Sequence, residues 1–403
     1  MKICLVSPYD YAYPGGVGNH VEALSDQFRA VGHEVSLIVP GTDDQETDEG
    51  NGIYRIGRAT PVPANGSVAR ISLSPRMVLR VKRLLASERF DVIHVHEPLM
   101  PALPPTVLRY SRSVNVATFH AYRPSSYSYY YGRPVLRQIL KKLDGRIAVS
   151  RAALGYISQY FPASYSIIPN GVDLRRYHAG ALPIERYQDG RPNILFVGRW
   201  EKRKGLSHLI RAYEMVQRHF SDARLLVVGP EGRHGRTYRD YAEYRGLRGI
   251  EFIGRVSDDD LVRYYRTCDI FCAPSTGGES FGLVLVEAMA SGKPVVTTDM
   301  EGYRQVVSSG VQGLLVPPRD DSALADALCH LLDKPDERAR LGANGRLAAM
   351  QYDWTHVSAR VLAYYREVLE GAPSSEPMLD GLFSTVGQPS PARGHDPGGA
   401  NAH

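Results

Sequence analysis

Short apolar runs alternate with helical patterns along most of the chain, as in the helix pattern over 21–31 that Gly32 closes. Strands that lack polar alternation and are each followed by a helix are typical of parallel sheets covered on both faces. The predicted strands are 3–6, 35–39, 91–95, 115–119 and 146–149, then 193–197, 225–228, 251–253, 269–272, 295–297 and 314–316.

The pattern stops near a Pro-Asn-Gly turn at 169–171 and then restarts, which predicts two doubly wound α/β domains in tandem. We place the N-terminal domain at 1–187 and the C-terminal domain at 188–354. An amphipathic helix is expected over 355–370, packed back on the first domain. Pro, Gly and Ser dominate 372–403, which predicts a disordered tail.

Composition narrows the class of protein. Of 403 residues, 43% are hydrophobic and 23% charged, which is typical of a soluble globular chain. The net charge of +5 is too small to indicate nucleic acid by itself. Four scattered cysteines favour a reducing, cytosolic setting over a disulfide scaffold or a zinc site. No apolar stretch has the length of a signal peptide core or a membrane span.

Two glycine-containing junctions follow predicted strands. Gly15-Gly16-Val17-Gly18 precedes a helix and lets a phosphate approach the backbone, although a simple tight turn explains it equally well. It is neither a dinucleotide fingerprint nor a P-loop. The second junction, 198–205, carries Arg199, Lys202, Arg203 and Lys204 at the carboxyl end of a strand. Such cations suit a diphosphate, and the alternative is a solvated charge run.

Two glutamates eight residues apart form a third candidate, in the string 277–290 after a predicted strand. Glu279 is expected in the loop before a helix, and Glu287 two turns along that helix. Carboxylates in these places accept hydrogen bonds from sugar hydroxyls. Paired glutamates are common in proteins, so the whole string carries the signal rather than the pair.

Together these strings resemble the retaining GT-B glycosyltransferases of the GT4 family, over about residues 1–370. The strings that carry the resemblance are the Gly15-Gly16 turn with Tyr9, 65–70 (NGSVAR), 94–98 (HVHEP), 117–120 (ATFH), 169–173 (PNGVD), the basic loop with Arg199 and Lys204, and Glu279 to Glu287. The resemblance implies two Rossmann-like domains that face each other across a cleft.

The resemblance also implies roles on the donor side. The catalytic residues would be His120, Glu279, Arg199 and Lys204. Arg199 and Lys204 would hold the donor diphosphate, for which Gly16 leaves room, with Phe281 and Gly282 in the same donor site. Glu279 would bind hydroxyls of the sugar, Glu287 the ribose, and His120 the sugar across the cleft. Taken alone, His120 is an ordinary histidine at a strand end.

Within the family, the strings imply transfer of mannose from GDP-mannose to the inositol ring of phosphatidylinositol. Tyr9, Asn65, Ser67 and Arg70 would bind this acceptor, with Arg70 on its phosphate. No DxD motif follows a strand, so no metal cofactor is implied, although Mg²⁺ dependence stays open. The chain departs from the family pattern at Ala64, in a basic loop that is one residue shorter, and in the tyrosine-rich segment 122–132.

A basic amphipathic helix is predicted over 75–85, with Arg76, Arg80 and Arg83 on one side beside an apolar arc. A second group of cations lies in 133–146. An ordinary solvated helix face is the alternative to an anionic membrane surface. The resemblance favours a peripheral enzyme at the inner face of the cytoplasmic membrane.

Other functions remain open from the residues. One is a GT4 enzyme with a UDP-sugar donor, or with a soluble inositol phosphate or another lipid as acceptor. Another is a non-catalytic nucleotide-sugar sensor, which has no need of all five residues His120, Arg199, Lys204, Glu279 and Glu287. Contacts to the nucleotide base usually come from backbone, so the base is not read from the sequence.

Overall fold

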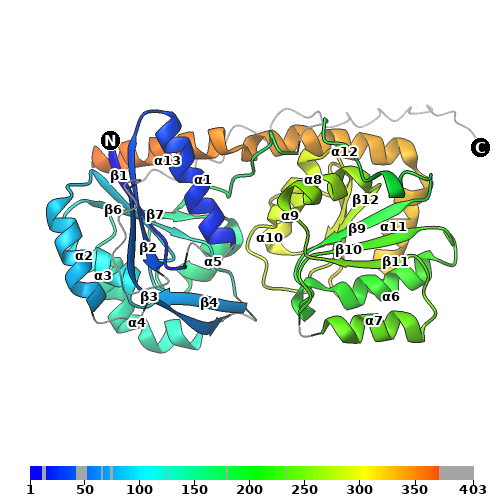
Figure 1. Ribbon diagram of the computed structural model, residues 1–403, viewed down its shortest axis with the longest axis horizontal. Helices are drawn as coiled ribbons and strands as arrows, with labels where there is room; N and C mark the ends of the chain where they lie inside the picture. The colour runs from blue at the N-terminus through cyan, green and yellow to red at the C-terminus, as the bar shows by residue number, and fades with distance from the viewer. Residues whose placement is uncertain are drawn as a thin grey trace, which may run out of the picture.

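Two β-sheets form the frame of the computed structural model, which describes residues 1–10, 15–41, 52–64, 67–72, 76–123, 125–177, 180–232 and 234–371 (Figure 1). The first sheet has the order β4-β3-β2-β1-β5-β6-β7-β8. Its strands are β1 (Lys2–Val6), β2 (Glu34–Gly41), β3 (Ile53–Ala64), β4 (Ser67–Ser72), β5 (Val92–His96), β6 (Val114–Phe119), β7 (Gly145–Ala148) and β8 (Ser166–Ile167).

The second sheet is wholly parallel and has the order β11-β10-β9-β12-β13-β14. Its strands are β9 (Asn193–Val197), β10 (Arg224–Val228), β11 (Ile250–Gly254), β12 (Ile270–Ala273), β13 (Val295–Thr298) and β14 (Gly313–Val316). The expected fold class, two doubly wound α/β domains, is confirmed.

One part of the first sheet departs from the parallel pattern. β3 and β4 form an antiparallel pair, with Thr60 opposite Ile71 and Ala64 opposite Ser67. The sequence did not predict these strands, because 53–64 and 67–72 mix Pro, Gly and Arg with apolar residues. The two-residue β8 was also missed, since a strand this short leaves no apolar run to recognise.

Helices cover both faces of the first sheet. One face packs Cys4, Val6 and Ile93 against α2 to α5, and the other packs Ile3 and Leu5 against α1 and α13. These helices are α1 (Gly16–Ala30), α2 (Arg76–Ser87), α3 (Leu103–Tyr110), α4 (Tyr127–Leu140), α5 (Arg151–Ser158) and α13 (Trp354–Leu369).

The second sheet is sandwiched in the same way. Ile194 and Phe196 face α6, α7 and α11, whereas Leu195 faces α8, α9 and α10. The helices are α6 (Leu206–Val216), α7 (Gly235–Tyr244), α8 (Asp258–Thr267), α9 (Leu283–Ala290), α10 (Glu301–Arg304), α11 (Asp321–Asp333) and α12 (Pro335–Ala349). Three 3₁₀ turns are η1 (Glu185–Tyr187), η2 (Lys202–Lys204) and η3 (Met350–Tyr352).

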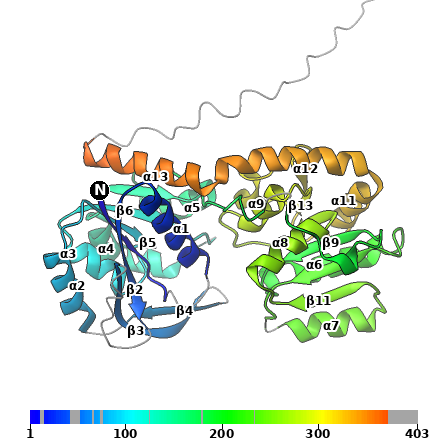
Figure 2. The same ribbon diagram turned by 45° about the horizontal axis from the view of Figure 1, so that its top comes forward.

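The chain returns to the first domain through α12 and α13, which follow one another along the same side of the molecule (Figure 2). The Tyr365 hydroxyl lies 2.6 Å from Nδ1 of the buried His94, and the backbone N–H of Arg146 donates to the Tyr364 hydroxyl. These contacts seat α13 on the first sheet. The boundary at 187/188 remains a prediction, and the predicted tail 372–403 lies outside the described residues.

The two chain crossings between the domains lie side by side. The backbone N–H of Val172 donates to the carbonyl of Tyr352 at 2.8 Å. A Cβ on Gly171 would come within 2.4 Å of the Trp354 ring. Only glycine therefore lets the backbone at 171 pack directly against the indole. Asp353 caps α13 by accepting from the backbone N–H of Thr355.

Candidate active site

The carboxyl ends of the two sheets face each other. Arg151 follows the carboxyl end of β7, and Gln305 lies soon after that of β13. The backbone N–H of Arg151 donates to Oε1 of Gln305 at 3.1 Å, which joins the two ends directly. Ligands of doubly wound sheets bind at such ends. The predicted residues His120, Arg199 and Glu279 all follow strands at these facing ends.

The basic loop after β9 is tied to the loop after β12. Gly205 has φ of 74°, and a Cβ there would lie 1.8 Å from the carbonyl oxygen of Pro274. The backbone N–H of Thr276 donates to the carbonyl of Arg203 at 2.7 Å. Glycine at 205 therefore lets the two loops meet, and this meeting brings the cations to Glu279.

Glu279 lies at the centre of the charge cluster. Its Oε1 atom lies 2.7 Å from Nζ of Lys204 and 2.6 Å from Nη1 of Arg203, and the side chain is only 10% exposed. Glu201 accepts from the Arg203 guanidinium and pairs with Arg199 at 3.2 Å. The structure thus gathers Arg199, Lys204 and Glu279, and it adds Arg203 rather than the exposed Lys202.

Glu287 lies apart from this cluster, within α9. The Tyr265 hydroxyl donates to its Oε2 atom at 2.7 Å. Burial raises the pKa of this carboxyl, opposed by hydrogen bonds from Tyr265 and Tyr177. Phe281, before the same helix, is buried against Tyr352, so its side chain belongs to the core. Gly282, the N-cap residue of α9, adopts φ of 91° beside the Tyr303 ring.

Gly16 begins α1, the first helix after β1. A Cβ on Gly15 or Gly16 would meet no atom within 4 Å. Packing among the described residues therefore does not require glycine at these positions. A helix N-terminus without a large side chain is suited to an anion such as a phosphate.

His120 is held by its backbone and by its ring. Oε1 of Glu97 accepts hydrogen bonds from the N–H groups of His120 and Ala121 at 2.6 and 2.7 Å. Nε2 of His120 lies 3.0 Å from Nδ1 of His96. Glu97 has a left-handed φ of 50°, rare for a non-glycine residue. Glu97 and His96 lie within the string 94–98 that carries the family resemblance, but the sequence did not predict a role for either residue.

Four histidines gather around this point from three segments. Burial, with repulsion from neighbouring histidines, lowers the pKa of His94 to about 3 and the pKa values of His20 and His96 well below the usual range. Burial also lowers the pKa of His120 to about 4. All four imidazoles are therefore neutral near pH 7.

Three of these rings, those of His20, His96 and His120, present nitrogens within 4.8 Å of one another. Among the described residues this is the group whose spacing suits a cation best. The hydrogen bond between His96 and His120 already uses two of the nitrogens. We assign no metal to the group, and independence from a metal cofactor stays a prediction.

The predicted acceptor residues are only partly described. Tyr9 is half-buried, and burial beside Glu97 raises the pKa of its hydroxyl, so Tyr9 lies near the segment that holds His120. Asn65 lies outside the described residues. Ser67 and Arg70 belong to β4, and their side chains are outside the description.

The predicted basic helix is present as α2. Arg76 and Arg83 are exposed, whereas Arg80 is half-buried, and Met77 and Val81 pack into the core. The expected arrangement of cations beside an apolar arc is therefore found for Arg76 and Arg83. Among the described residues, no helix is both long and apolar enough to cross a bilayer.

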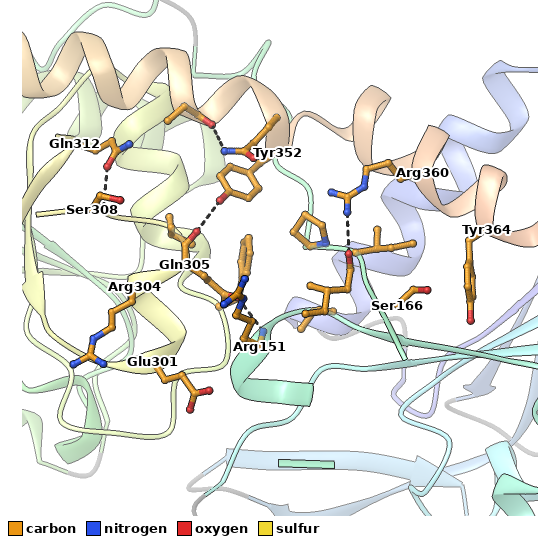
Figure 3. A pocket seen from close by; sticks show the side chains of 18 of the residues that line it. Arg151, Ser166, Glu301, Arg304, Gln305, Ser308, Gln312, Tyr352, Arg360 and Tyr364 are labelled. Carbon is orange, nitrogen blue, oxygen red and sulfur yellow. Dashed lines mark hydrogen bonds between the residues drawn. The ribbon is translucent and has the colours of Figure 1, made fainter. Parts of the chain in front are cut away.

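A cavity of about 690 Å³ lies at the junction of the domains (Figure 3). Its walls include Arg151 from the first domain, Gln305 from the second, and Tyr352 and Arg360 near the returning chain. The Tyr352 hydroxyl donates to the carbonyl of Gln305, and Arg360 donates to the carbonyl of Ile167. Phe281 is the one predicted site residue in its lining, so this cavity is separate from the charge cluster.

Two facing Rossmann-like domains, with clustered cations and a carboxylate at the strand ends of the second, define the architecture of the GT-B glycosyltransferases. Residues 14–176 match the family model described as Glycosyltransferase Family 4, and residues 183–348 match the one described as Glycosyl transferases group 1. The chain belongs to the family 4 glycosyltransferases and is a hexosyltransferase.

Curated relatives match nearly the whole chain. The phosphatidyl-myo-inositol mannosyltransferase of Mycobacterium leprae is 40% identical over 369 residues, covering 91% of this chain and 97% of the relative. That of Mycolicibacterium smegmatis is 36% identical over 92% and 95%. A glycogen synthase of Mycobacterium tuberculosis is 30% identical over 94% and 98%.

Solved structures share the fold. A sucrose-phosphate synthase from Thermosynechococcus elongatus has a TM-score of 0.73 at 24% identity, covering 92% of this chain and 99% of that one. The Anabaena protein HepE, in complex with UDP and glucose, has a TM-score of 0.73 at 20% identity, covering 91% and 100%. These likenesses confirm the two-domain architecture.

The neutral histidines predict a loss of stability in mild acid. In the unfolded chain histidine has a pKa near 6.5, so between pH 6.5 and 5 the unfolded state binds more protons than the folded one. The contribution of these histidines to the free energy of unfolding is therefore greatest above pH 6.5. It decreases as the pH is lowered, by about 1.4 kcal/mol per pH unit for each histidine that stays neutral in the folded protein. Urea unfolding at pH 7 and pH 5 measures this.

His94→Gln removes one buried imidazole. It should reduce the pH dependence of the unfolding free energy by the contribution of one histidine, about 1.4 kcal/mol per pH unit. His356→Gln, on the exposed side of α13, is the control and should leave it unchanged. An unfolding free energy that is equal at pH 7 and pH 5 in the unmodified protein would contradict the neutral state of the cluster.

Proposed function

We propose that the protein transfers mannose, with retention, from GDP-mannose to the inositol ring of phosphatidylinositol at the inner face of the cytoplasmic membrane. The observation that carries this proposal is the 40% identity, over nearly the full length of both chains, to a phosphatidyl-myo-inositol mannosyltransferase. The arrangement of charges in the candidate active site supports it.

The cations of the basic loop are suited to the leaving diphosphate. Without a donor, Lys204 and Arg203 both pair with Glu279. A diphosphate offers several anionic oxygens to the same groups, and the guanidiniums can bind them in a bidentate manner. In this proposal Arg199, Arg203 and Lys204 turn to the diphosphate and neutralise the charge that develops as the sugar departs.

Release from the cations leaves Glu279 free to accept hydrogen bonds from hydroxyls of the sugar. Glu287, hydrogen-bonded by Tyr265 deeper in the second domain, is suited to the ribose hydroxyls. In this proposal the two carboxylates bind the two ends of the nucleotide sugar, with the diphosphate between them beside the basic loop.

His120 lies on the opposite domain, and its proposed role differs from that of the cations. Its low pKa keeps the ring neutral, so it adds no positive charge against a developing oxocarbenium centre. A neutral imidazole both donates and accepts a hydrogen bond, and the Glu97 carboxylate fixes the backbone that carries it. We assign His120 to the transferred sugar and Tyr9, Asn65, Ser67 and Arg70 to the acceptor.

The direct test is a product assay with a panel of donors and acceptors. GDP-linked and UDP-linked hexoses are each incubated with phosphatidylinositol, soluble inositol phosphate and other membrane lipids. Mass spectrometry should show one added hexose on phosphatidylinositol with GDP-mannose, and NMR of the product should show the anomeric configuration of the donor. Transfer from a UDP-sugar, or to a soluble acceptor alone, would favour the alternative GT4 activities.

The two glutamates should separate catalysis from nucleotide binding. Glu279→Gln loses a charged acceptor for the sugar and should lower kcat by roughly 10²-fold, equivalent to about 2.7 kcal/mol of transition-state binding. Its affinity for GDP, measured by calorimetry, should stay close to that of the unmodified enzyme. Glu287→Gln should instead weaken GDP about tenfold.

Glu243→Gln, exposed on α7, is the matched control and should change neither quantity. Normal turnover in Glu279→Gln, or an equal loss of GDP and GDP-mannose affinity, would remove Glu279 from the sugar site.

The α2 helix should bind anionic membranes through its arginines. Each cation near an anionic surface contributes about 1 kcal/mol, so replacing Arg76, Arg80 and Arg83 by Ser should lower vesicle partitioning by roughly two orders of magnitude at low salt. Activity on the lipid should fall while GDP binding stays normal. Because Arg80 is half-buried, the double variant of Arg76 and Arg83 provides the same test with the core intact.

The charge-matched control replaces three exposed arginines of the second domain, Arg218, Arg236 and Arg346, by Ser. Co-sedimentation with vesicles at two salt concentrations tests this prediction. At high salt, screening should abolish the difference in partitioning between the α2 variants and the unmodified enzyme. Equal partitioning of the α2 variants and the unmodified enzyme at low salt would make α2 an ordinary solvated helix.

A further inference from the structure

The outward face of α4 carries an unusual number of exposed apolar side chains. Tyr127, Tyr130, Tyr131 and Val135 are 80%, 65%, 76% and 69% exposed. The rings of Tyr130 and Tyr131 contact each other edge to face at 5.2 Å. Among the residues that the structure describes, no other helix carries more than one large apolar side chain with comparable exposure.

These side chains form a stripe with helical spacing. At about 100° per residue, the four positions fall within an arc of about 140°. The opposite side of α4 is the one that packs: Tyr129 stacks on Tyr156 and contacts Phe161, and Leu140 is buried in the same cluster. The core is therefore satisfied from the far side of the helix, and the tyrosine stripe takes no part in it.

The charged residues of α4 and of the turn that follows it, up to Leu143, are all basic. No Asp or Glu occurs between residues 125 and 143. Arg137, Lys141 and Lys142 are exposed and fall on or beside the same arc of the helix. An aromatic stripe with cations at its border and no acidic residue is complementary to an anionic surface with an apolar interior.

The stripe lies on the same face of the first sheet as α2. Both helices pack into one hydrophobic cluster, and α3 contacts each of them. Leu79, on the outer side of α2, is likewise 59% exposed. These two helices, each in contact with α3, thus present cations and apolar side chains outward from one layer of the domain.

We propose that the outer face of α4 is a membrane-binding surface, in which Tyr127, Tyr130, Tyr131 and Val135 enter the interfacial region of an anionic bilayer. Tyrosine is suited to this place because its ring is apolar while its hydroxyl stays hydrated. Arg137, Lys141 and Lys142 would lie at the level of the lipid phosphates. The inference rests on the membrane association in the proposed function and deepens it by adding a second, aromatic contact.

The aromatic contact should be insensitive to salt, unlike the arginines of α2. The variant Tyr127→Ser/Tyr130→Ser/Tyr131→Ser should partition at least about tenfold less into phosphatidylcholine vesicles that contain phosphatidylinositol. This difference should persist at high salt, where the electrostatic part is screened. Tyr244→Ser is the matched control, since Tyr244 is 85% exposed on α7 of the second domain. Equal partitioning of the triple variant and the control would overturn the proposal.

A single substitution reports insertion directly. The chain has two tryptophans, Trp200 and Trp354, which are both buried, so Tyr130→Trp introduces one exposed fluorophore. Vesicles should shift its emission to the blue, and brominated lipids should quench it, while Tyr244→Trp should do neither. Absence of both effects in Tyr130→Trp, in a protein that sediments with the vesicles, would exclude insertion of the stripe.

These readouts do not depend on turnover. If phosphatidylinositol receives no mannose but the tyrosine variants still lose vesicle binding, the inference stands and the proposed acceptor fails. If mannose is transferred and the variants bind vesicles normally, the proposed function stands and the inference fails. If the tyrosine substitutions instead change the oligomeric state, measured by analytical sedimentation, and leave vesicle binding unaltered, the surface is a protein contact. That result would overturn the proposal.

Discussion

The arrangement of the active site depends on the double crossing of the chain between the domains. Val172 on the outgoing segment is hydrogen-bonded to Tyr352 on the returning one, and Gly171 passes directly against Trp354. Because α13 is then seated on the first sheet through Tyr365 and His94, both crossings are anchored to the same domain. Any movement of the second domain must bend the chain there, beside the junction cavity.

Opposite charges balance one another at the strand ends of the second domain. Glu279 and Glu201 form ion pairs with Arg199, Arg203 and Lys204 at the strand ends. Clustered cations repel one another, and the carboxylates offset that repulsion. In the proposed function, diphosphate binding would therefore exchange one set of ion pairs for another rather than fill an uncompensated positive site.

The sequence predicted most of this frame because buried parallel strands leave continuous apolar runs, and eleven such runs became strands with small shifts at their ends. It missed β3 and β4, where Pro61 and Pro63 interrupt any recognisable pattern. The role of Glu97 could not be predicted from the sequence, because it depends on the strand register. The register pairs His96 with Thr118, and this pairing brings the Glu97 carboxylate to the backbone N–H groups that follow β6. Likewise, only the folded 3₁₀ turn determines that Arg203 rather than Lys202 meets Glu279.

The position of α4 connects the proposed membrane surface with the acceptor side of the site. On its inner side, burial raises the pKa of the Tyr129 hydroxyl, and Glu97 and Tyr9 lie close enough to add to this rise. Glu97 in turn holds the backbone of His120. A lipid acceptor keeps its acyl chains in the bilayer while its head group reaches the enzyme, so a membrane contact is useful only near the residues that receive the head group. α4 meets this requirement because its outer face carries the tyrosine stripe, whereas its inner face places Tyr129 near Glu97 and Tyr9.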